Sequence, residues 1–257
     1  MPSPFRLPPL RPALQPFRLH YFSRLRSTND HAIALRQRGD LYAPAIVLTG
    51  HQTAGRGRGS NAWWSGEGSL TVTFALPIEE GVAPHHLPLI AGVAVREGVA
   101  QLIGSDDLVQ LKWPNDLLAD GRKLAGLLCE RAHKVDLIGL GLNVNVTRSQ
   151  VPAALRGRVT SLSQLTGRRL DMNDVLATVA RHLHAALSHR REQSFAALLR
   201  RYDAHHALVG RQVKITGVAE PALVGRCEGL DDIGRLLVRE GPRLHRVIAG
   251  HVEAMGE

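Results

Sequence analysis

A long run of residues that is apolar on nearly every side constrains the fold of this chain most. Residues 87–103 contain no polar stripe, and their large apolar side chains fall all around a helical wheel, at Leu89, Ile90, Val93, Val99 and Leu102. A helix without a polar face has to be covered on all sides by the rest of the protein. We therefore predict that this segment is a buried helix.

Strand patterns lie on both sides of that helix. The segments with strand character are 18–25, 44–49, 69–76, 108–113, 123–131 and 135–145. Residues 69–76 alternate apolar and polar positions, which predicts a strand with one buried face. Asp120-Gly121 is a strong turn signal and predicts a hairpin between two of the strands. Strands and helices mixed in this order predict an α/β core.

Further helices and a C-terminal segment of short strands complete the expected organisation. Ser27, Thr28 and Asn29 are good N-cap residues for a helix that runs to about Gly39. Residues 172–187 have the period of an amphipathic helix, and residues 194–205 predict another. From about residue 208 to 257, short strands alternate with glycine turns, which predicts a small β-barrel appended to the core.

Composition narrows the classes of function. The formal net charge of +9 invites a nucleic-acid hypothesis, but the arginines are dispersed along the chain instead of clustered. The two cysteines have neither disulfide nor zinc spacing, and no apolar run is long enough to span a bilayer. Residues 1–16 are rich in proline and arginine and predict a flexible lead-in. A cytoplasmic protein without a membrane segment is the expectation.

A glycine- and arginine-rich loop is the first segment that indicates chemistry. Residues 50–68 have no periodicity and contain Q-T-A-G-R-G-R at positions 52–58. Glycines let the backbone approach a ligand, and the guanidinium groups of Arg56 and Arg58 match phosphate or carboxylate. The pattern predicts a clamp over an anionic ligand. An RNA-binding glycine–arginine segment remains the alternative.

A second segment combines Lys112-Trp113-Pro114-Asn115-Asp116 with a lysine on the next strand. The Trp-Pro step ends the strand, so Asn115 and Asp116 are expected to project at its end. The predicted hairpin then brings Lys123 near Asp116. A lysine beside an aspartate is usually a solvated pair that contributes about 1 kcal/mol or less. Both segments together in one α/β domain favour a binding site.

These segments resemble the motifs of the biotin–protein ligases, in the short form without an N-terminal DNA-binding domain. The matching stretches, in chain order, are S-T-N at 27–29, Q-T-A-G-R-G-R at 52–58, K-W-P-N-D at 112–116, G-R-K-L-A-G-L-L-C-E at 121–130 and G-L-G-L-N-V-N at 139–145. The resemblance extends from about residue 17 to the C-terminus. It implies a mixed sheet flanked by helices over residues 17–207 and an SH3-like barrel over 208–257.

The resemblance also implies an activity. Biotin and ATP would form biotinyl-5′-AMP, and the biotinyl group would pass to a lysine of a biotin carboxyl carrier protein. Magnesium would arrive with ATP, and no protein-only metal site is expected. The alternative hypotheses for the function are a lipoate-type protein ligase, a biotin sensor without catalysis, and a nucleic-acid binder.

The family assigns each matching residue a place. The biotin-binding residues would be Ser27, Thr28, Asn29, Gln52, Gly55, Arg56, Gly57, Arg58 and Lys123. The ATP-binding residues would be Arg58, Asn115, Asp116, Lys123 and Asn143. The catalytic residues among them would be Lys123, Asp116 and Arg58. Fixed cations at these positions suit the attack of a carboxylate on a phosphate, because the two anions repel each other.

Two departures from the family pattern concern the same site. Ser60 and Asn61 stand where many relatives have glycine and a basic residue. Residues 250–255 read G-H-V-E-A-M, so an arginine that contacts the adenylate in some members is missing. The resemblance allows a homodimer, but no segment of the sequence identifies an interface. DNA binding is not expected.

Overall fold

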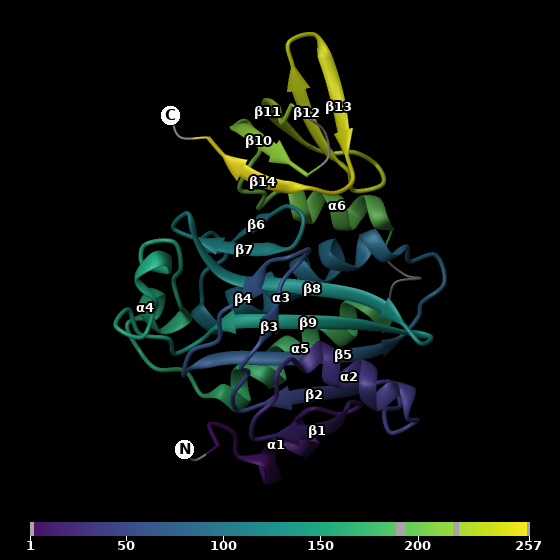
Figure 1. The fold of residues 1–257 in the computed structure, drawn as a ribbon, viewed down its shortest axis with the longest axis vertical. Coiled ribbons are helices and arrows are strands. Elements are labelled where there is room, and N and C mark those ends of the chain that lie inside the picture. The colour runs from purple at the N-terminus through teal and green to yellow at the C-terminus, as the bar shows by residue number, and fades with distance from the viewer. Residues whose placement is uncertain (1–2, 189–193, 218–220, 256–257) are drawn as a thin grey trace.

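The computed structural model describes residues 3–188, 194–217 and 221–255, which form a large mixed sheet with helices and a smaller sheet beside it (Figure 1). The large sheet has seven strands in the order β1-β2-β5-β9-β8-β7-β6. Their bounds are Arg18–Phe22 (β1), Ala45–Thr49 (β2), Ser69–Pro77 (β5), Val135–Asn143 (β9), Arg122–Ala132 (β8), Asp116–Ala119 (β7) and Gln110–Lys112 (β6). Only β1 and β2 run parallel, so the predicted mixed sheet is confirmed.

The helices include the predicted buried one. They are α1 (Leu7–Ala13), α2 (Thr28–Gln37), α3 (Leu87–Ile103), α4 (Leu162–Thr166), α5 (Met172–Ser188) and α6 (Phe195–Asp203), with short 3₁₀ turns at Pro84–His86 and Ala153–Leu155. Helix α3 has the predicted bounds, and most of its side chains are buried. The Ser27 hydroxyl caps α2 by accepting from the Asp30 N–H, as the N-cap pattern predicts.

Strand β5 differs from its prediction, because both of its faces are buried. Leu70, Val72 and Phe74 point into the main core, as the alternation indicates. The other face carries Thr73 and Ala75, which are also buried. Helix α2 covers that second face and contacts β5. The polar positions of the alternating pattern therefore meet a helix and a binding pocket in place of water.

The prediction of a flexible lead-in for residues 1–16 is wrong for the residues that the structure describes. Leu7–Ala13 form helix α1, and Leu10, Leu14 and Phe5 are buried in the main core. The prolines at the start of α1 do not prevent the helix, because the first-turn N–H groups have no helical partner in any case. Apolar burial thus outweighs the proline content.

The helix α1 anchor gives a stability prediction. Leu10→Ala removes a fully buried side chain, so we expect it to lower the free energy of unfolding by about 2–5 kcal/mol. Urea denaturation followed by circular dichroism measures this. Ala13→Ser, at an exposed position of the same helix, is the control and should change it by less than about 0.5 kcal/mol. Equal midpoints for the two variants would contradict the anchoring role of α1.

The C-terminal part is a five-stranded antiparallel sheet. Its strands are β10 (Gln212–Thr216), β11 (Leu223–Leu230), β12 (Leu236–Glu240), β13 (Arg243–Val247) and β14 (His251–Ala254), in the order β13-β12-β11-β10-β14. The segment predicted as a small β-barrel is thus an antiparallel sheet, in which no pairing within the described ranges joins β13 to β14. The Trp113 indole N–H donates to the Gly234 carbonyl at 3.1 Å and ties this sheet to the large one.

Among the helices that the structure describes, none combines the length and apolarity that crossing a membrane requires.

Candidate active site

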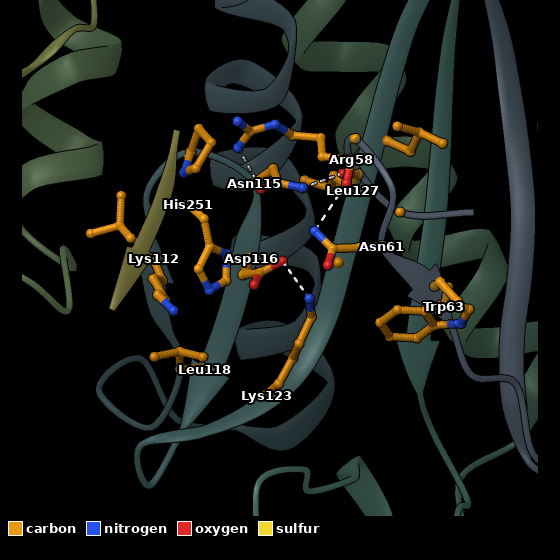
Figure 2. A pocket seen from close by; sticks show the side chains of 18 of the residues that line it. Arg58, Asn61, Trp63, Lys112, Asn115, Asp116, Leu118, Lys123, Leu127 and His251 are labelled. Atoms are coloured by element: carbon orange, nitrogen blue, oxygen red, sulfur yellow. Dashed lines mark hydrogen bonds and ion pairs between the residues drawn. The ribbon is translucent and has the colours of Figure 1, made fainter. Parts of the chain in front are cut away.

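A cavity of about 1140 Å³, lined by charged, polar and apolar residues, lies where the two sheets and a small hairpin meet (Figure 2). The hairpin consists of β3 (Gly55–Arg56) and β4 (Ala62–Trp63), within the segment predicted as a loop. Strands β7, β8 and β9 supply the floor, and β14 supplies a wall from the C-terminal sheet. The residues predicted for the site line this cavity, with the exception of Gly55, which lies beside Gln52 and the Trp63 backbone.

Lys123 and Asp116 form an ion pair inside the cavity. The Lys123 Nζ lies 2.7 Å from the Asp116 Oδ1, and their side chains are 36% and 19% exposed. Strands β7 and β8 pair here, so the predicted hairpin does bring the two residues together. The Lys123 Nζ also lies 5.6 Å from the centre of the Trp63 ring. A cation held between a carboxylate and an aromatic face can receive a further anion from the cavity.

Arg58 bridges the hairpin, the large sheet and the C-terminal sheet. Its guanidinium donates to the Asn115 Oδ1 at 3.4 Å and to the Gly250 carbonyl at 3.1 Å (Figure 2). The Asn115 amide in turn donates to the Leu127 carbonyl at 2.6 Å. Burial lowers the pKa of Arg58, and the charge of Asp116 opposes that shift. The C-terminal sheet therefore holds a group that faces the cavity.

The hairpin turn contains one of the two departures from the family pattern. The Asn61 amide donates to the Arg58 carbonyl at 3.0 Å, and the Gly57 N–H donates to the Asn61 carbonyl at 2.7 Å. Asn61 therefore closes the turn through its own side chain.

The far end of the cavity is lined by uncharged polar groups. The Thr28 N–H donates to the Gln52 Oε1 at 2.9 Å, and the Thr28 hydroxyl lies 3.3 Å from the same oxygen. The Thr73 hydroxyl lies 2.6 Å from the Asn29 Oδ1 and 2.9 Å from the Thr28 hydroxyl. Ser27, Thr28 and Asn29 are all buried at the start of helix α2. This arrangement suits a neutral ligand with N–H and C=O groups.

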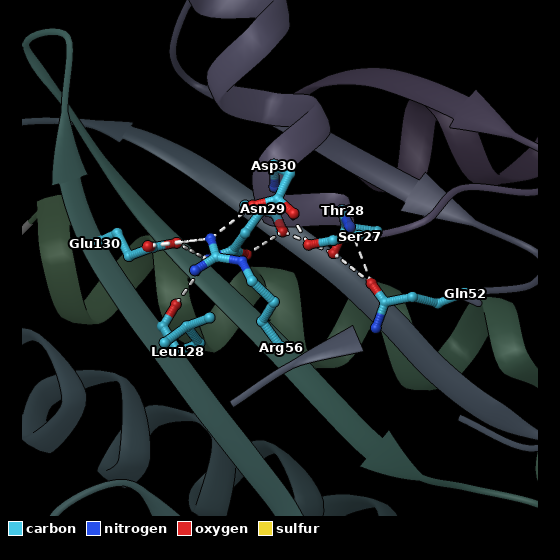
Figure 3. A network of polar contacts seen from close by, with 9 residues as sticks. Ser27, Thr28, Asn29, Asp30, Gln52, Arg56, Leu128 and Glu130 are labelled. Atoms are coloured by element: carbon cyan, nitrogen blue, oxygen red, sulfur yellow. Dashed lines mark hydrogen bonds and ion pairs between the residues drawn. The ribbon is translucent and has the colours of Figure 1, made fainter. Parts of the chain in front are cut away.

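Arg56 lies in a second cluster, next to that polar end (Figure 3). Its Nη2 is 2.7 Å from the Asp30 Oδ1, and 3.1 and 2.9 Å from the two oxygens of Glu130. Glu130 also accepts from the Asn29 Nδ2 at 2.8 Å. Burial acts to lower the pKa of Arg56, but the hydrogen bond and charge of Glu130, with Asp30, raise it overall.

Glycines on the floor make room for these side chains. A Cβ on Gly139 would lie 2.2 Å from the Asn29 Oδ1, and a Cβ on Gly141 would lie 2.2 Å from the Trp63 ring. Residues two apart on a strand share a face, so one face of β9 is bare backbone here. A Cβ on Gly126 would meet Lys123 at 3.2 Å and Asp116 at 3.3 Å. The G-L-G-L-N segment therefore serves the site mainly through the side chains it lacks.

Several residues of the cavity were missed by the sequence analysis. Lys112 lines it, and burial lowers the pKa of Lys112, while the charge of Asp116 opposes that shift. His251 stands in the wall supplied by β14 (Figure 2). Trp63 of the small hairpin also lines the cavity. The position of Lys112 in the K-W-P-N-D stretch was a usable signal. For His251 the signal was its place in residues 250–255, where some family members have an arginine that contacts the adenylate.

Apart from the Asp116 Oδ1, whose partner is the Lys123 ammonium, two buried polar atoms of cavity-lining residues have no hydrogen-bond partner among the described residues: the Asn143 Oδ1 and the Trp63 Nε1. Buried polar groups are normally paired, so each marks a place where a ligand can bind. The described residues were also compared with the ligand sets that metal ions require. No group of three or more histidine, cysteine, aspartate or glutamate side chains able to hold an ion occurs in residues 3–188, 194–217 and 221–255.

The sequence of this chain is similar to those of known proteins. A family model described as "Biotin/lipoate A/B protein ligase family" matches residues 21–146. The biotin–[acetyl-CoA-carboxylase] ligase of Mycobacterium tuberculosis is 33% identical over 88% of this chain and 85% of its own length. The bifunctional ligase/repressor BirA of Escherichia coli is 32% identical over 83% of this chain and 67% of its own length.

The fold is also similar to that of a solved structure. The biotin protein ligase from Aquifex aeolicus, in complex with biotin and ATP, superposes with a TM-score of 0.82 and 27% identity. The match covers 93% of this chain and 99% of that one. The similarity therefore extends over both the large sheet and the C-terminal sheet.

Proposed function

The chain belongs to the biotin–protein ligases of the biotin/lipoate A/B protein ligase family, and from that premise we infer that it is an ATP-dependent ligase for biotin. It forms biotinyl-5′-AMP with release of pyrophosphate. It then transfers the biotinyl group to a lysine of a biotin carboxyl carrier protein. The relatives with this activity in their names, and the related structure that holds biotin and ATP, support the inference.

One observation carries the proposal from the side of the site. A single cavity joins a neutral polar end, at Thr28, Asn29 and Gln52, to a charged end, at Asp116 and Lys123. Biotin has the matching polarity, with an uncharged ureido ring at one end and a carboxylate at the other. Placed with its ring among the polar groups, it directs its carboxylate toward Lys123.

The charged end fits the first half-reaction. A biotin carboxylate oxygen attacks the α-phosphorus of ATP, a P–O bond forms, and the bond to the pyrophosphate leaving group breaks. Lys123 is positioned to neutralise charge on both reacting anions, and Arg58 to pair with the phosphate. The buried Asn143 Oδ1 is available to accept a hydrogen bond from the nucleotide.

The second half-reaction requires a neutral amine and dry surroundings. The lysine amine of the carrier attacks the acyl carbon, the bond to the phosphate oxygen breaks, and AMP leaves. Asp116 is positioned to orient that amine and to accept its proton. The hairpin at Gly55–Trp63 covers the cavity and limits hydrolysis of the mixed anhydride.

Magnesium would bind only together with ATP. It is commonly held by one or two carboxylates together with substrate phosphates. Asp116 and the Asn143 Oδ1 are oxygen donors in the cavity that fit such a complex. When bound, the ion would neutralise charge on the phosphates.

The same proposal covers the protein that accepts biotin, the cellular location of the chain and its oligomeric state. A carrier protein as acceptor follows from the names of the relatives. A cytoplasmic location fits the use of ATP and the two free cysteines, Cys129 and Cys227. A homodimer, allowed by the family resemblance, stays a prediction.

Biotin-dependent exchange of labelled pyrophosphate into ATP tests the function. We expect exchange with biotin and magnesium, and at least about a hundredfold less with lipoate, because a polar end built for N–H and C=O groups is left unpaired by the dithiolane ring. Exchange with lipoate alone would move the assignment to a lipoate-type ligase. Biotin binding without any exchange would identify a sensor.

A further inference from the structure

Glu130 connects two parts of the cavity that the proposed function uses separately. It lies on strand β8, outside the cavity lining, and its side chain is 28% exposed. One of its oxygens accepts from Asn29 at the polar end, and both accept from Arg56 of the covering hairpin (Figure 3). No other residue that the structure describes forms a hydrogen bond or an ion pair with both of these side chains.

The contact with Asn29 sets the direction of its amide. The orientation of an amide is decided by its partners. The Asn29 Nδ2 faces Glu130 at 2.8 Å and the Leu128 carbonyl at 3.1 Å, both of which only accept hydrogen bonds. The nitrogen must therefore point at them. The Oδ1 is left facing the Thr73 hydroxyl and the bare backbone of Gly139.

An amide oxygen held in this direction presents an acceptor to the cavity. A carbonyl-type oxygen has two lone pairs, and the Thr73 hydroxyl uses one of them. The other can accept from a ligand N–H, such as those of a ureido ring. Without the carboxylate, the amide loses one of the two acceptors that fix it.

The contact with Arg56 acts on the hairpin. Arg56 belongs to β3, and β3 pairs with β4, which carries Trp63 next to Gly141 and Lys123. Glu130 and Asp30 hold the same guanidinium, one from the large sheet and one from helix α2. The hairpin is thereby fixed over the cavity by charge-assisted hydrogen bonds.

We propose that Glu130 is a positioning residue that fixes the Asn29 amide for ligand recognition and also holds the covering hairpin through Arg56. This inference rests on the proposed function. It assigns to one carboxylate two effects that can be measured apart: affinity for biotin, through Asn29, and retention of the adenylate, through the hairpin.

Asp30 supplies the matched control, because it contacts Arg56 without contacting the Asn29 amide. Glu130→Gln keeps the size of the side chain and removes its charge. We expect it to raise the KM for biotin in pyrophosphate exchange about tenfold, the value of one charge-assisted hydrogen bond. We also expect more AMP released per biotinylated carrier, because the anhydride escapes or hydrolyses. Asp30→Asn should increase AMP release alone and leave the KM for biotin within about twofold.

The outcomes separate the inference from the function on which it rests. No exchange by the unsubstituted protein would refute the proposed function itself. Full exchange, with Glu130→Gln and Asp30→Asn changing the KM for biotin equally, would overturn the role through Asn29. Unchanged AMP release in both variants would overturn the role through the hairpin.

Thermal unfolding and a second variant show whether a change in KM results from a folding defect. Glu130→Asp keeps the charge but withdraws it from both partners, so it should give the same rise in KM. If both variants at this position fail to fold, the assignment is overturned in favour of a structural role. Binding of biotin without ATP, measured by calorimetry, should weaken by the same factor as the KM rises.

Discussion

Lys123→Ala is expected to reduce biotin-dependent pyrophosphate exchange by about a thousandfold, the loss that follows removal of one group preorganised at a developing charge. The Lys123 ammonium lies 2.7 Å from Asp116 and faces the cavity where the carboxylate and the phosphate would meet. Alanine leaves Asp116 without its cation, so two anionic substrates would approach a third negative charge. The loss should therefore fall on the rate of exchange more than on the affinity for biotin.

Lys214→Ala is the matched control for this prediction. Lys214 lies on β10 of the C-terminal sheet, is exposed, and is not among the residues that line the cavity. Its replacement should leave exchange within about twofold, since exposed charges away from a site contribute little. Equal rates for Lys123→Ala and the unsubstituted protein would refute the placement of the reacting phosphate beside Lys123.

Local patterns were enough to predict most elements of the fold. The helix at Leu87–Ile103 was predicted with its observed bounds, because a segment apolar on all sides leaves few alternatives. The lead-in was wrong because composition reports local preference, whereas Leu10 and Leu14 are buried by contacts with residues far along the chain. Strand β5 was predicted as half-buried because alternation does not reveal that helix α2 covers the second face.

The site was predictable where one motif contains both partners or where a turn joins them. Lys123 and Asp116 meet because a hairpin at Asp120-Gly121 connects their strands. Glu130 was quoted in a motif without a role, since its partners Asn29 and Arg56 come from distant segments. Contacts of that kind depend on the order of strands in the sheet, which local patterns do not specify.

Gly139→Ala should have the second large effect, although it adds only one methyl group. The new Cβ would lie 2.2 Å from the Asn29 Oδ1 and 2.9 Å from its Cγ, far inside van der Waals contact. Asn29 cannot simply turn away, because Thr73, Leu128 and Glu130 hold its amide. We expect the KM for biotin to rise about a hundredfold, and the free energy of unfolding to fall by about 1–3 kcal/mol, as overpacking usually costs.

Gly92→Ala tests whether that effect is local. Gly92 lies in helix α3, where a new Cβ would meet the Leu111 Cδ2 at an ordinary contact distance of 3.4 Å. Alanine is a better helix former than glycine, so this variant should be about 0.5–1 kcal/mol more stable, with an unchanged KM for biotin. The same methyl group is thus predicted to have opposite effects at two buried glycines. If Gly139→Ala left both the stability and the KM unchanged, the bare face of β9 would not be what positions Asn29.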